Sequence, residues 1–332
     1  MTASYDKNTA VVVLPPAVGG RISDPSLRGW LAQADLVRNN ERVELLASIL
    51  RELDRPYPTS GLAALRMWGE TGDRPTSWIA AADPVYLEPR LDNLCLHALR
   101  RGGVSPAELR PLIDHLQRAL GGDSGFGFAR LGSNGYLTSQ QPIASASVPP
   151  YVIDQRVPSN FLPQGDDVAS HRNLLSEIEM ALHDHEINAE RESAGKFPVN
   201  SLWIWGGGYA PEQQTEPHPP LFSDDALLTG YWQSMMGLAE SWPGNIAACL
   251  DVAVAGFVAT LPEFDDDDEL LESCLRELRG ALSSNRLSSL ILLFRDDLRA
   301  EVRRSHSMRL WRRRNTLLEA PPEDSREQIR RE

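Results

Sequence analysis

The sequence LHDHEINAERESAGKFPVNSLWIWGGG, residues 182–208, joins a helical pattern to a short apolar strand and a run of three glycines. Apolar residues in the segment 170–191 recur at the spacing of one helix face. Residues 202–205 form a continuous apolar run, which is typical of a strand covered on both faces, as in a parallel sheet. The stretch therefore predicts a helix, a short connection and a buried strand of an α/β protein.

Three polar residues of this stretch are candidates for ligand binding. His185, Asn188 and Arg191 are spaced i, i+3 and i+6, which places them within about 120° of arc on a continuous helix. The guanidinium of Arg191 offers a fixed fork of donors for a phosphate or carboxylate. The alternative is a polar helix end whose arginine caps a carbonyl. His183 and His185 point apart on a helix, which disfavours a His-x-His metal site.

The glycines Gly206, Gly207 and Gly208 follow the apolar strand. Glycines at the carboxyl end of a strand let the backbone approach a ligand and expose its N–H groups, and this edge of an α/β sheet is where ligands bind. A loop that needs positive φ angles explains the same residues equally well. Trp203 and Trp205 alternate along the strand, so they share one face and favour core packing.

Other segments extend the α/β pattern. Apolar runs at 10–14, 252–258 and 287–294 predict buried strands, and leucines between 271 and 282 predict a helix. Ser105 and Glu108 form a capping box before a helical pattern that ends near residue 120. The glycine-rich segment that follows predicts a hairpin.

These patterns predict an α/β core interrupted by a small insertion. The core comprises 1–74 and 166–318 and has a mixed sheet with helices on both faces. The insertion, 75–165, is a small α+β domain with a linker, and the polar tail 319–332 is expected to be frayed.

Composition limits the functional classes. The 332 residues carry a net charge of −13, which disfavours nucleic acid as the main partner. Cys95, Cys249 and Cys274 form no C-x-x-C pair, which disfavours a disulfide framework or a thiolate zinc site and fits a reducing cytoplasm. No segment has the pattern of a signal peptide or a membrane span. The arginine-rich stretch 303–314 is either an anion-binding face or a salt-bridged surface.

The motif H-x-[VI]-N-x-x-R-x-x-x-G-x-x-P-x-N, met from His185 through Gly195 and Pro198 to Asn200, resembles the archaeal-type cofactor-independent phosphoglycerate mutases. These belong to the alkaline-phosphatase superfamily, so the resemblance implies an alkaline-phosphatase-like core. PVNSLWIWGGG, the ADPVYL at 82–87 and the RLWRRR at 309–314 resemble a bacterial group, the RpfE-type regulatory proteins. The relatives place substrate-facing groups near the position of Asp83, at the start of the insertion, although an Asp that begins a turn before proline is at least an equal alternative.

The resemblance implies a serine nucleophile and two divalent metals. TSGLAALRMWG matches the nucleophile motif, which places Ser60 at the nucleophile but Gly61 and Ala64 where an Asp and a His stand. The first-strand carboxylate falls near Leu14 and Pro15 and is missing. A serine hydroxyl is a poor nucleophile unless a base or a metal activates it.

The remaining metal-ligand positions are partly kept. Asp265 and Asp297 stand where histidines are expected, and Asp296 and His306 match the family pattern. Carboxylates in place of histidines favour a hard ion such as Mg²⁺ over Mn²⁺ or Zn²⁺.

Two hypotheses result. The first is a degenerate relative that acts as a regulatory protein and binds an anionic small molecule or a protein partner. The second is a metal-dependent phosphoglycerate mutase or phosphohydrolase that uses Ser60. In the first, the binding cleft contains Asp83, His185, Asn188, Arg191, Asn200, Gly206, Gly207 and Gly208.

Overall fold

The computed structural model describes residues 8–99, 103–122, 125–164, 168–262, 268–309, 311–312 and 314–319. Asp265 and the tail beyond Glu319 lie outside these residues. The chain forms two compact units. The first unit comprises Met1–Tyr57, Gln214–Asp225 and Met235–Glu332, and the second comprises Pro58–Gln213 and Ala226–Ser234.

The first unit contains a mixed seven-stranded sheet in the order β2-β12-β11-β1-β10-β8-β9. Strands β11, β1, β10, β8 and β9 are parallel, and β12 pairs antiparallel with both β11 and β2. The predicted α/β fold with a mixed sheet is confirmed here. The strands are β1 (Thr9–Leu14), β2 (Asp35–Arg38), β8 (Leu221–Phe222), β9 (Ala239–Glu240), β10 (Phe257–Thr260), β11 (Ser289–Phe294) and β12 (Leu298–Arg303).

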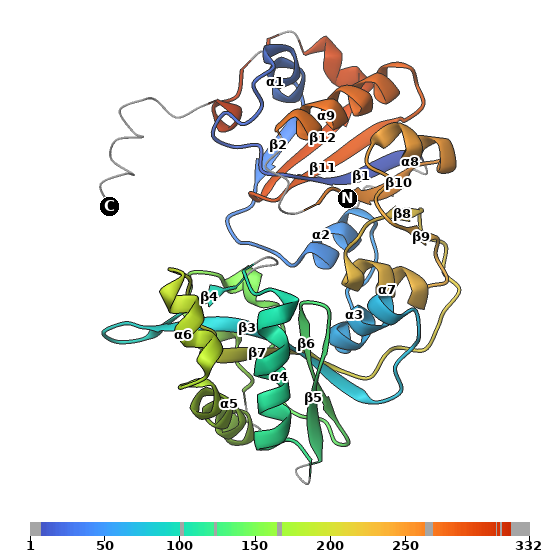
Figure 1. Ribbon diagram of the computed structural model, residues 1–332. Coiled ribbons are helices and arrows are strands. Elements are labelled where there is room, and N and C mark those ends of the chain that lie inside the picture. Colours follow the sequence, from blue (N-terminus) through green and yellow to red (C-terminus); the bar gives the residue numbers. More distant parts are fainter. Residues whose placement is uncertain are drawn as a thin grey trace. The chain divides into compact units, whose positions relative to one another are not determined.

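Helices α1 (Pro25–Ala32) and α9 (Asp268–Ser283) cover the sheet of the first unit on the face that carries Ala10, Val12 and Leu14 (Figure 1). The unit also contains α2 (Leu45–Glu52), α8 (Ile246–Val252) and 3-10 turns at Arg304–Met308 and Thr316–Leu318. The predicted strand at 252–258 is wrong in its first half, because the side chain of Asn245 caps α8 and the helix runs to Val252.

The second unit contains a five-stranded antiparallel sheet. Its order is β4-β3-β6-β5, and β7 pairs with β3 along its other edge. The predicted hairpin is confirmed as β5 and β6, joined by residues 132–133. The strands are β3 (Trp78–Pro89), β4 (Leu94–Ala98), β5 (Phe126–Leu131), β6 (Asn134–Ser139) and β7 (Ser201–Gly208).

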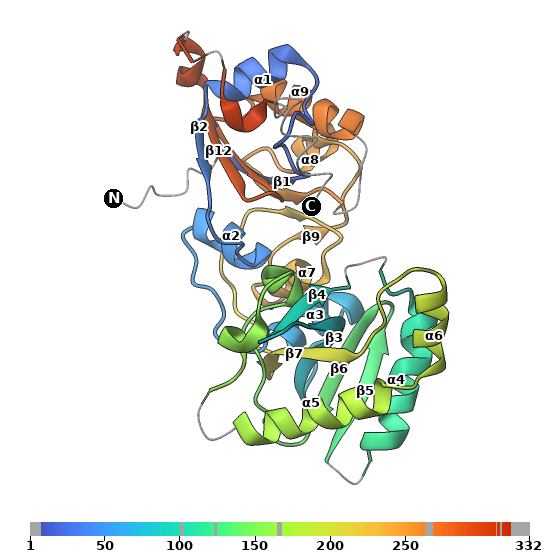
Figure 2. The ribbon, with the colours of Figure 1, turned by 90° about the vertical axis from the view of Figure 1, so that its left-hand side faces the viewer.

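Helices cover both faces of this second sheet. Figure 2 shows α4 (Pro106–Leu120) and α5 (Val168–Leu182) running over one face, where they pack on Ala80, Ala82 and Ile204. Helix α3 (Leu62–Thr71) contacts β3 and β7 and packs along α7 (Ala226–Ser234). The predicted capping box of α4 is confirmed. The unit is completed by α6 (Glu186–Ser193) and by 3-10 turns at Pro150–Ile153 and Pro158–Phe161.

The compact units differ from the expected limits of 1–74, 75–165 and 166–318. The segments 58–74 and 166–213 belong to the second unit because β7 pairs with β3 and not with the larger sheet. Trp203 and Trp205 are buried, as expected for core residues. A continuous apolar run indicates that both faces of a strand are buried. Helices on both sides of an antiparallel sheet bury its strands in the same way as those of a parallel sheet, so the run does not distinguish the two.

Candidate functional site

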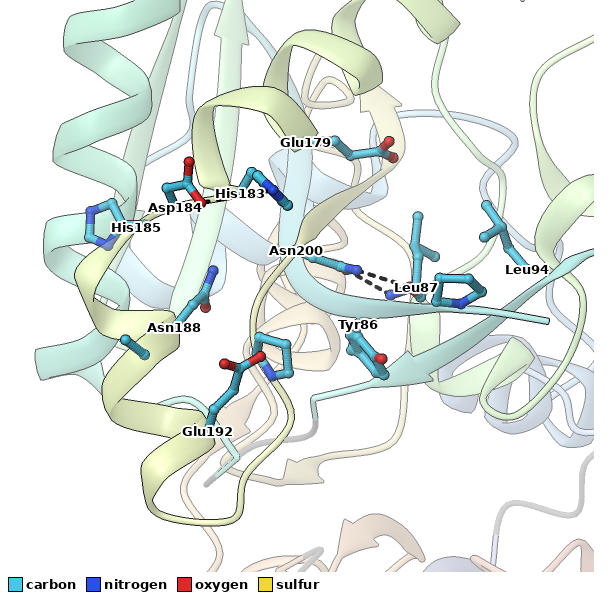
Figure 3. Close-up of a pocket in the computed structure, with 13 residues that line it drawn as sticks. Tyr86, Leu87, Leu94, Glu179, His183, Asp184, His185, Asn188, Glu192 and Asn200 are labelled. Carbon is cyan, nitrogen blue, oxygen red and sulfur yellow. Dashed lines mark hydrogen bonds and ion pairs between the residues drawn. The ribbon is translucent and has the colours of Figure 1, made fainter.

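A pocket of about 660 Å³ lies in the second unit, beside the connection between α5 and α6; we call it the α5–α6 pocket. Figure 3 shows side chains around it from β3, from the start of β4, from α5, α6 and their connection, and from the residue that precedes β7. Three of the predicted binding residues line it, namely His185, Asn188 and Asn200. The complete lining is Tyr86, Leu87, Pro89, Leu94, Glu179, His183, Asp184, His185, Asn188, Ala189, Glu192, Pro198 and Asn200.

The helix expected through residue 191 is broken at the pocket. Helix α5 ends at Leu182, and α6 begins at Glu186 with His185 as its N-cap in extended conformation. The imidazole of His185 accepts a hydrogen bond from the N–H of Ile187 at 3.3 Å. The prediction that His185, Asn188 and Arg191 share one helix face is therefore wrong, because a polar cap replaces the helical turn.

Two asparagines hold the pocket wall together. Asn188 donates to the carbonyls of Leu182 and Val199, each at 2.9 Å, and accepts from the N–H of Val199 at 2.8 Å. Asn200 accepts from the N–H of Leu87 at 2.8 Å and donates to its carbonyl at 2.9 Å. These amides line the pocket, yet their hydrogen bonds fix α6 and β3 against the chain that leads into β7.

Arg191 does not line the pocket. Its buried guanidinium donates to the carbonyls of Phe197 and Gly103 and, at 2.8 Å, to the carboxylate of Glu108. Although burial raises the pKa of Glu108, hydrogen bonds from Ser105 and the charge of Arg191 lower it to about 2. The expectation that Arg191 offers its donors to a bound anion is wrong. The arginine caps carbonyls and pairs with a carboxylate of the protein, in agreement with the alternative interpretation.

The pocket is acidic. Glu179, Asp184 and Glu192 contribute carboxyl groups, and none of the described residues that line the pocket is Lys or Arg. Burial raises the pKa of Glu179. Burial, followed by the charge of the neighbouring His115, lowers the pKa of His185, so its ring is neutral at pH 7. Such a site repels phosphate and attracts cations.

The glycine run packs against the protein's own backbone. Gly61 donates its N–H to the carbonyl of Gly207 at 3.2 Å, and Gly207 donates to the hydroxyl of Ser145. A Cβ atom on Gly208 would lie 2.4 Å from the nitrogen of Gly61. Gly206, Gly207 and Gly208 thus allow β7 to approach the start of α3, and the expected ligand loop is instead an internal contact.

Ser60 is exposed and directly precedes Gly61, the N-cap residue of α3. Its role as a nucleophile, which the resemblance implies, stays a prediction. Among the described metal-ligand candidates, Asp296, Asp297 and His306 belong to the first unit, whereas Ser60 belongs to the second.

Asp83 lies in a buried polar cluster of the second unit. Both of its carboxylate oxygens accept from Arg66, at 2.9 and 3.0 Å, and one also accepts from the indole N–H of Trp205 at 2.7 Å. Arg66 also donates to the hydroxyl of Tyr136 and lies over its ring, 4.7 Å from the centroid. Asp83 lies inside β3, so the alternative of a turn before proline is wrong. Its carboxylate neutralises a buried arginine, and a substrate-facing role stays a prediction.

The metal-ligand candidates Asp296 and Asp297 lie in the turn between β11 and β12. One carboxylate oxygen of Asp296 accepts from the N–H groups of Ala17 and Val18, at 2.8 and 2.6 Å. Its other oxygen is buried without a hydrogen bond among the described residues. Asp297 adopts a φ of 66° and lies 4.0 Å from the guanidinium of Arg42.

His306 lies at the opposite end of β12 from Asp297. A six-residue strand spans about 20 Å, and His306 instead pairs with Asp35 at 3.5 Å. Arg309 and Arg312 pair with the same carboxylate, so these arginines of the 303–314 stretch form salt bridges. Within the described ranges, Asp296, Asp297 and His306 do not converge on a divalent metal, and Asp265 lies outside them.

Several pocket residues carry no recognisable signal in the sequence. Glu179 lies on α5 and Glu192 on α6, where each has the spacing of an ordinary surface residue. Tyr86 lies in the last part of β3. Only the antiparallel pairing of β3 with β7 brings these positions to one pocket, and no local pattern encodes that pairing. Among the described residues, no helix has the length and apolar character needed to span a membrane.

No family model matches the chain. A probable 2,3-bisphosphoglycerate-independent phosphoglycerate mutase from Geobacter sulfurreducens is 28% identical over 173 residues, 51% of this chain and 40% of that protein. A 2,3-bisphosphoglycerate-independent phosphoglycerate mutase 2 from Methanothermobacter thermautotrophicus is 33% identical over 115 residues, 34% of this chain and 29% of that protein.

A solved structure shares the fold over most of the chain. The PH0037 protein from Pyrococcus horikoshii superposes with a TM-score of 0.50 and 13% identity, and the match covers 89% of this chain and 87% of that one. The chain spans less than half the length of the curated relatives it matches. The chain is thus related in sequence to cofactor-independent phosphoglycerate mutases.

Proposed function

We propose that this chain is a ligand-binding, regulatory relative of the cofactor-independent phosphoglycerate mutases, and that the α5–α6 pocket binds a small organic cation. The observation that carries the proposal is the charge of the pocket: Glu179, Asp184 and Glu192 line it, and its lining among the described residues contains neither arginine nor lysine. Apolar surface from Leu87 and Leu94 suits the carbon chain of an amine.

Charge also distinguishes this proposal from the anionic ligand that the sequence predicts. A phosphate in the α5–α6 pocket would meet carboxylates and neutral polar groups, while the guanidinium of Arg191 is held by Phe197, Gly103 and Glu108. Removing a phosphate from water without a cationic partner is unfavourable. An amine gains Coulomb attraction from the same carboxylates.

The placement of the metal-ligand candidates supports binding over phosphoryl transfer. Such transfer needs cations beside the moving group. Asp296 is engaged by two backbone N–H groups, and His306 lies at the other end of β12. A serine nucleophile without that assistance is weak.

A second candidate is a metal-dependent phosphoglycerate mutase or phosphohydrolase that uses Ser60. It is favoured by the exposure of Ser60 before α3 and by the sequence relation to the mutases. A nucleophile at a helix N-terminus receives help from the helix dipole when a phosphate binds.

An activity assay separates the two candidates. The full chain is supplied with Mg²⁺, Mn²⁺ or Zn²⁺ and tested for interconversion of 2- and 3-phosphoglycerate and for hydrolysis of p-nitrophenyl phosphate. We expect the rates of the wild type to equal those of Ser60→Ala. Metal-dependent turnover that Ser60→Ala abolishes would establish the second candidate and overturn the binding proposal.

A further inference from the structure

Three potential metal ligands converge on one face of the β3–β4 hairpin. Glu88 and Cys95 are directly paired across the two strands, and His97 follows two residues after Cys95, on the same face. One ligand atom from each lies within 4.8 Å of the other two. The carboxylate of Glu88 and Nε2 of His97 are already 3.0 Å apart. We call this set the β3–β4 cluster.

We propose that the β3–β4 cluster binds one Zn²⁺ through the thiolate of Cys95, an imidazole nitrogen of His97 and a carboxylate oxygen of Glu88. Cysteine thiolates, histidine nitrogens and carboxylate oxygens are the usual protein ligands of zinc, which binds four ligands in a tetrahedron. The thiolate and imidazole together select a borderline-soft ion over Mg²⁺. Three protein ligands leave the fourth position open to water or a small ligand.

The geometry requires only a small closure. Zinc–ligand bonds of 2.0 to 2.3 Å separate tetrahedral ligand atoms by about 3.5 Å. Metal binding therefore requires the limit of 4.8 Å between the ligand atoms to fall by roughly 1 Å, which we expect from rotation of the side chains. The backbone need not move, because the register between β3 and β4 already pairs Glu88 with Cys95.

The surroundings orient the ligands. The ring of His97 lies against Tyr86 and Phe197, with ring centroids 5.7 and 4.9 Å away. Cys95 is a buried free thiol, whereas His97 and Glu88 are partly exposed and give an ion access from solvent. The pairing of β3 and β4 already holds the thiol, the imidazole and the carboxylate close together, as a metal site requires.

Arg90 forms hydrogen bonds to the carboxylate of Glu88 that would bind zinc. Its guanidinium donates twice to Glu88, each time at 3.1 Å, and its side chain is 53% exposed. An exposed pair of this kind contributes little stability and breaks easily. The thiolate of Cys95 and the carboxylate of Glu88 together neutralise the charge of Zn²⁺. The bound ion therefore replaces Arg90 as the positive charge beside Glu88.

The test uses the full chain freed of metal with a chelator. Co²⁺ replaces the spectroscopically silent Zn²⁺ and reports a thiolate ligand by a charge-transfer absorption band in the near ultraviolet. We expect this band and tetrahedral visible bands to saturate at one Co²⁺ per chain, and Zn²⁺ to displace them. Weak octahedral bands without thiolate charge transfer would overturn the proposal.

Variants assign the ligands. Cys95→Ser is expected to abolish the charge-transfer band, and Glu88→Gln, at a half-exposed position, to weaken Zn²⁺ binding about tenfold or more. Arg90→Ala is expected to tighten it. Cys249→Ala removes a buried cysteine of the first unit and serves as the matched control. Equal Co²⁺ spectra in folded Cys95→Ser and in the wild type would contradict the assignment, and circular dichroism establishes that each variant is folded.

Discussion

The guanidinium of Arg191 lies 2.8 Å from the carboxylate of Glu108, which joins the end of α6 to the start of α4. The same guanidinium donates to two carbonyls, of Phe197 and Gly103. An arginine with the spacing of an anion-binding residue is thereby a structural residue of the second unit. The difference is measurable because a structural arginine controls stability, whereas a ligand-binding arginine controls affinity.

Replacing Arg191 is expected to destabilise the protein. Arg191→Met leaves Glu108 with fewer donors and two carbonyls without their partner, at a cost of about 3 kcal/mol in the free energy of unfolding. Urea denaturation measures this. Arg110→Met, at an exposed pair with Asp114, is the control and should change stability by about 0.5 kcal/mol or less. Unchanged stability in Arg191→Met, with loss of ligand binding, would restore the anion-binding interpretation.

The same ion pair predicts a pH dependence of stability. The pKa of Glu108 falls from its ordinary 4.5 to about 2 in the folded protein. A depressed folded pKa gives stability that is present above the unfolded pKa and is lost as the pH falls toward the folded one. Partial exposure limits the contribution to about 2 kcal/mol.

The window for this loss lies between about pH 5 and pH 2. Free energies of unfolding are compared across it for the wild type and Glu108→Gln, so that other carboxylates cancel. The gap between the two proteins should shrink as the pH falls. A gap that stays constant would show that the ionised form of Glu108 is not what stabilises the fold.

Two glycines flank α3 with nearly equal φ angles, 77° at Gly61 and 78° at Gly72. A Cβ on Gly61 would lie 2.4 Å from the carbonyl oxygen of Tyr209, whereas a Cβ on Gly72 meets nothing within 4 Å. Gly72→Ala should cost about 1 kcal/mol for the left-handed conformation alone. Gly61→Ala should cost about 3 kcal/mol or more, because the backbone must also separate.

Thermal or urea unfolding compares the two variants directly. Equal losses would mean that the chain after β7 does not press against the start of α3. The close approach assigned to the glycine run would then be wrong.

Asp83 provides a test inside the second sheet. Asp83→Asn keeps the shape of the side chain but removes the charge that neutralises Arg66, whose side chain is only 10% exposed. Although burial lowers the pKa of Arg66, the charge of Asp83 keeps that pKa above its usual range, so the arginine stays charged. We expect a loss of about 3 kcal/mol. The control Asp114→Asn, at an exposed pair, should be nearly neutral, and a similarly small effect of Asp83→Asn would indicate a functional carboxylate.

Local signals in the sequence identify elements well. The capping box of Ser105 and Glu108 locates the start of α4, and the apolar runs locate β1, β7 and β11. Each of these signals depends on neighbours within one turn or one strand. They carry no information about which sheet a strand joins, so they do not indicate that β7 pairs with β3.

The candidate site is predicted only in part. His185, Asn188 and Asn200 do line the α5–α6 pocket, but Arg191 and Asp83 form ion pairs within the second unit, and the glycine run packs against the start of α3. The partners of those groups, Glu108, Arg66 and Gly61, are distant in sequence or belong to another element. The β3–β4 cluster has a partial local indication in the sequence: Cys95 and His97 are alternate residues of one strand and therefore share a face.

Calorimetric titration determines whether the α5–α6 pocket prefers an organic cation to a phosphate. Spermidine is titrated into the full chain, and 3-phosphoglycerate is titrated separately. The double variant Asp184→Asn and Glu192→Gln removes two pocket carboxylates, while Glu190→Gln changes a neighbouring carboxylate of α6 that does not line the pocket.

We expect spermidine to bind the wild type more tightly than 3-phosphoglycerate does. The double variant should bind spermidine about tenfold more weakly, and Glu190→Gln should bind spermidine with the affinity of the wild type. Tighter binding of 3-phosphoglycerate, or an equal loss of spermidine affinity in Glu190→Gln and the double variant, would contradict the proposed function.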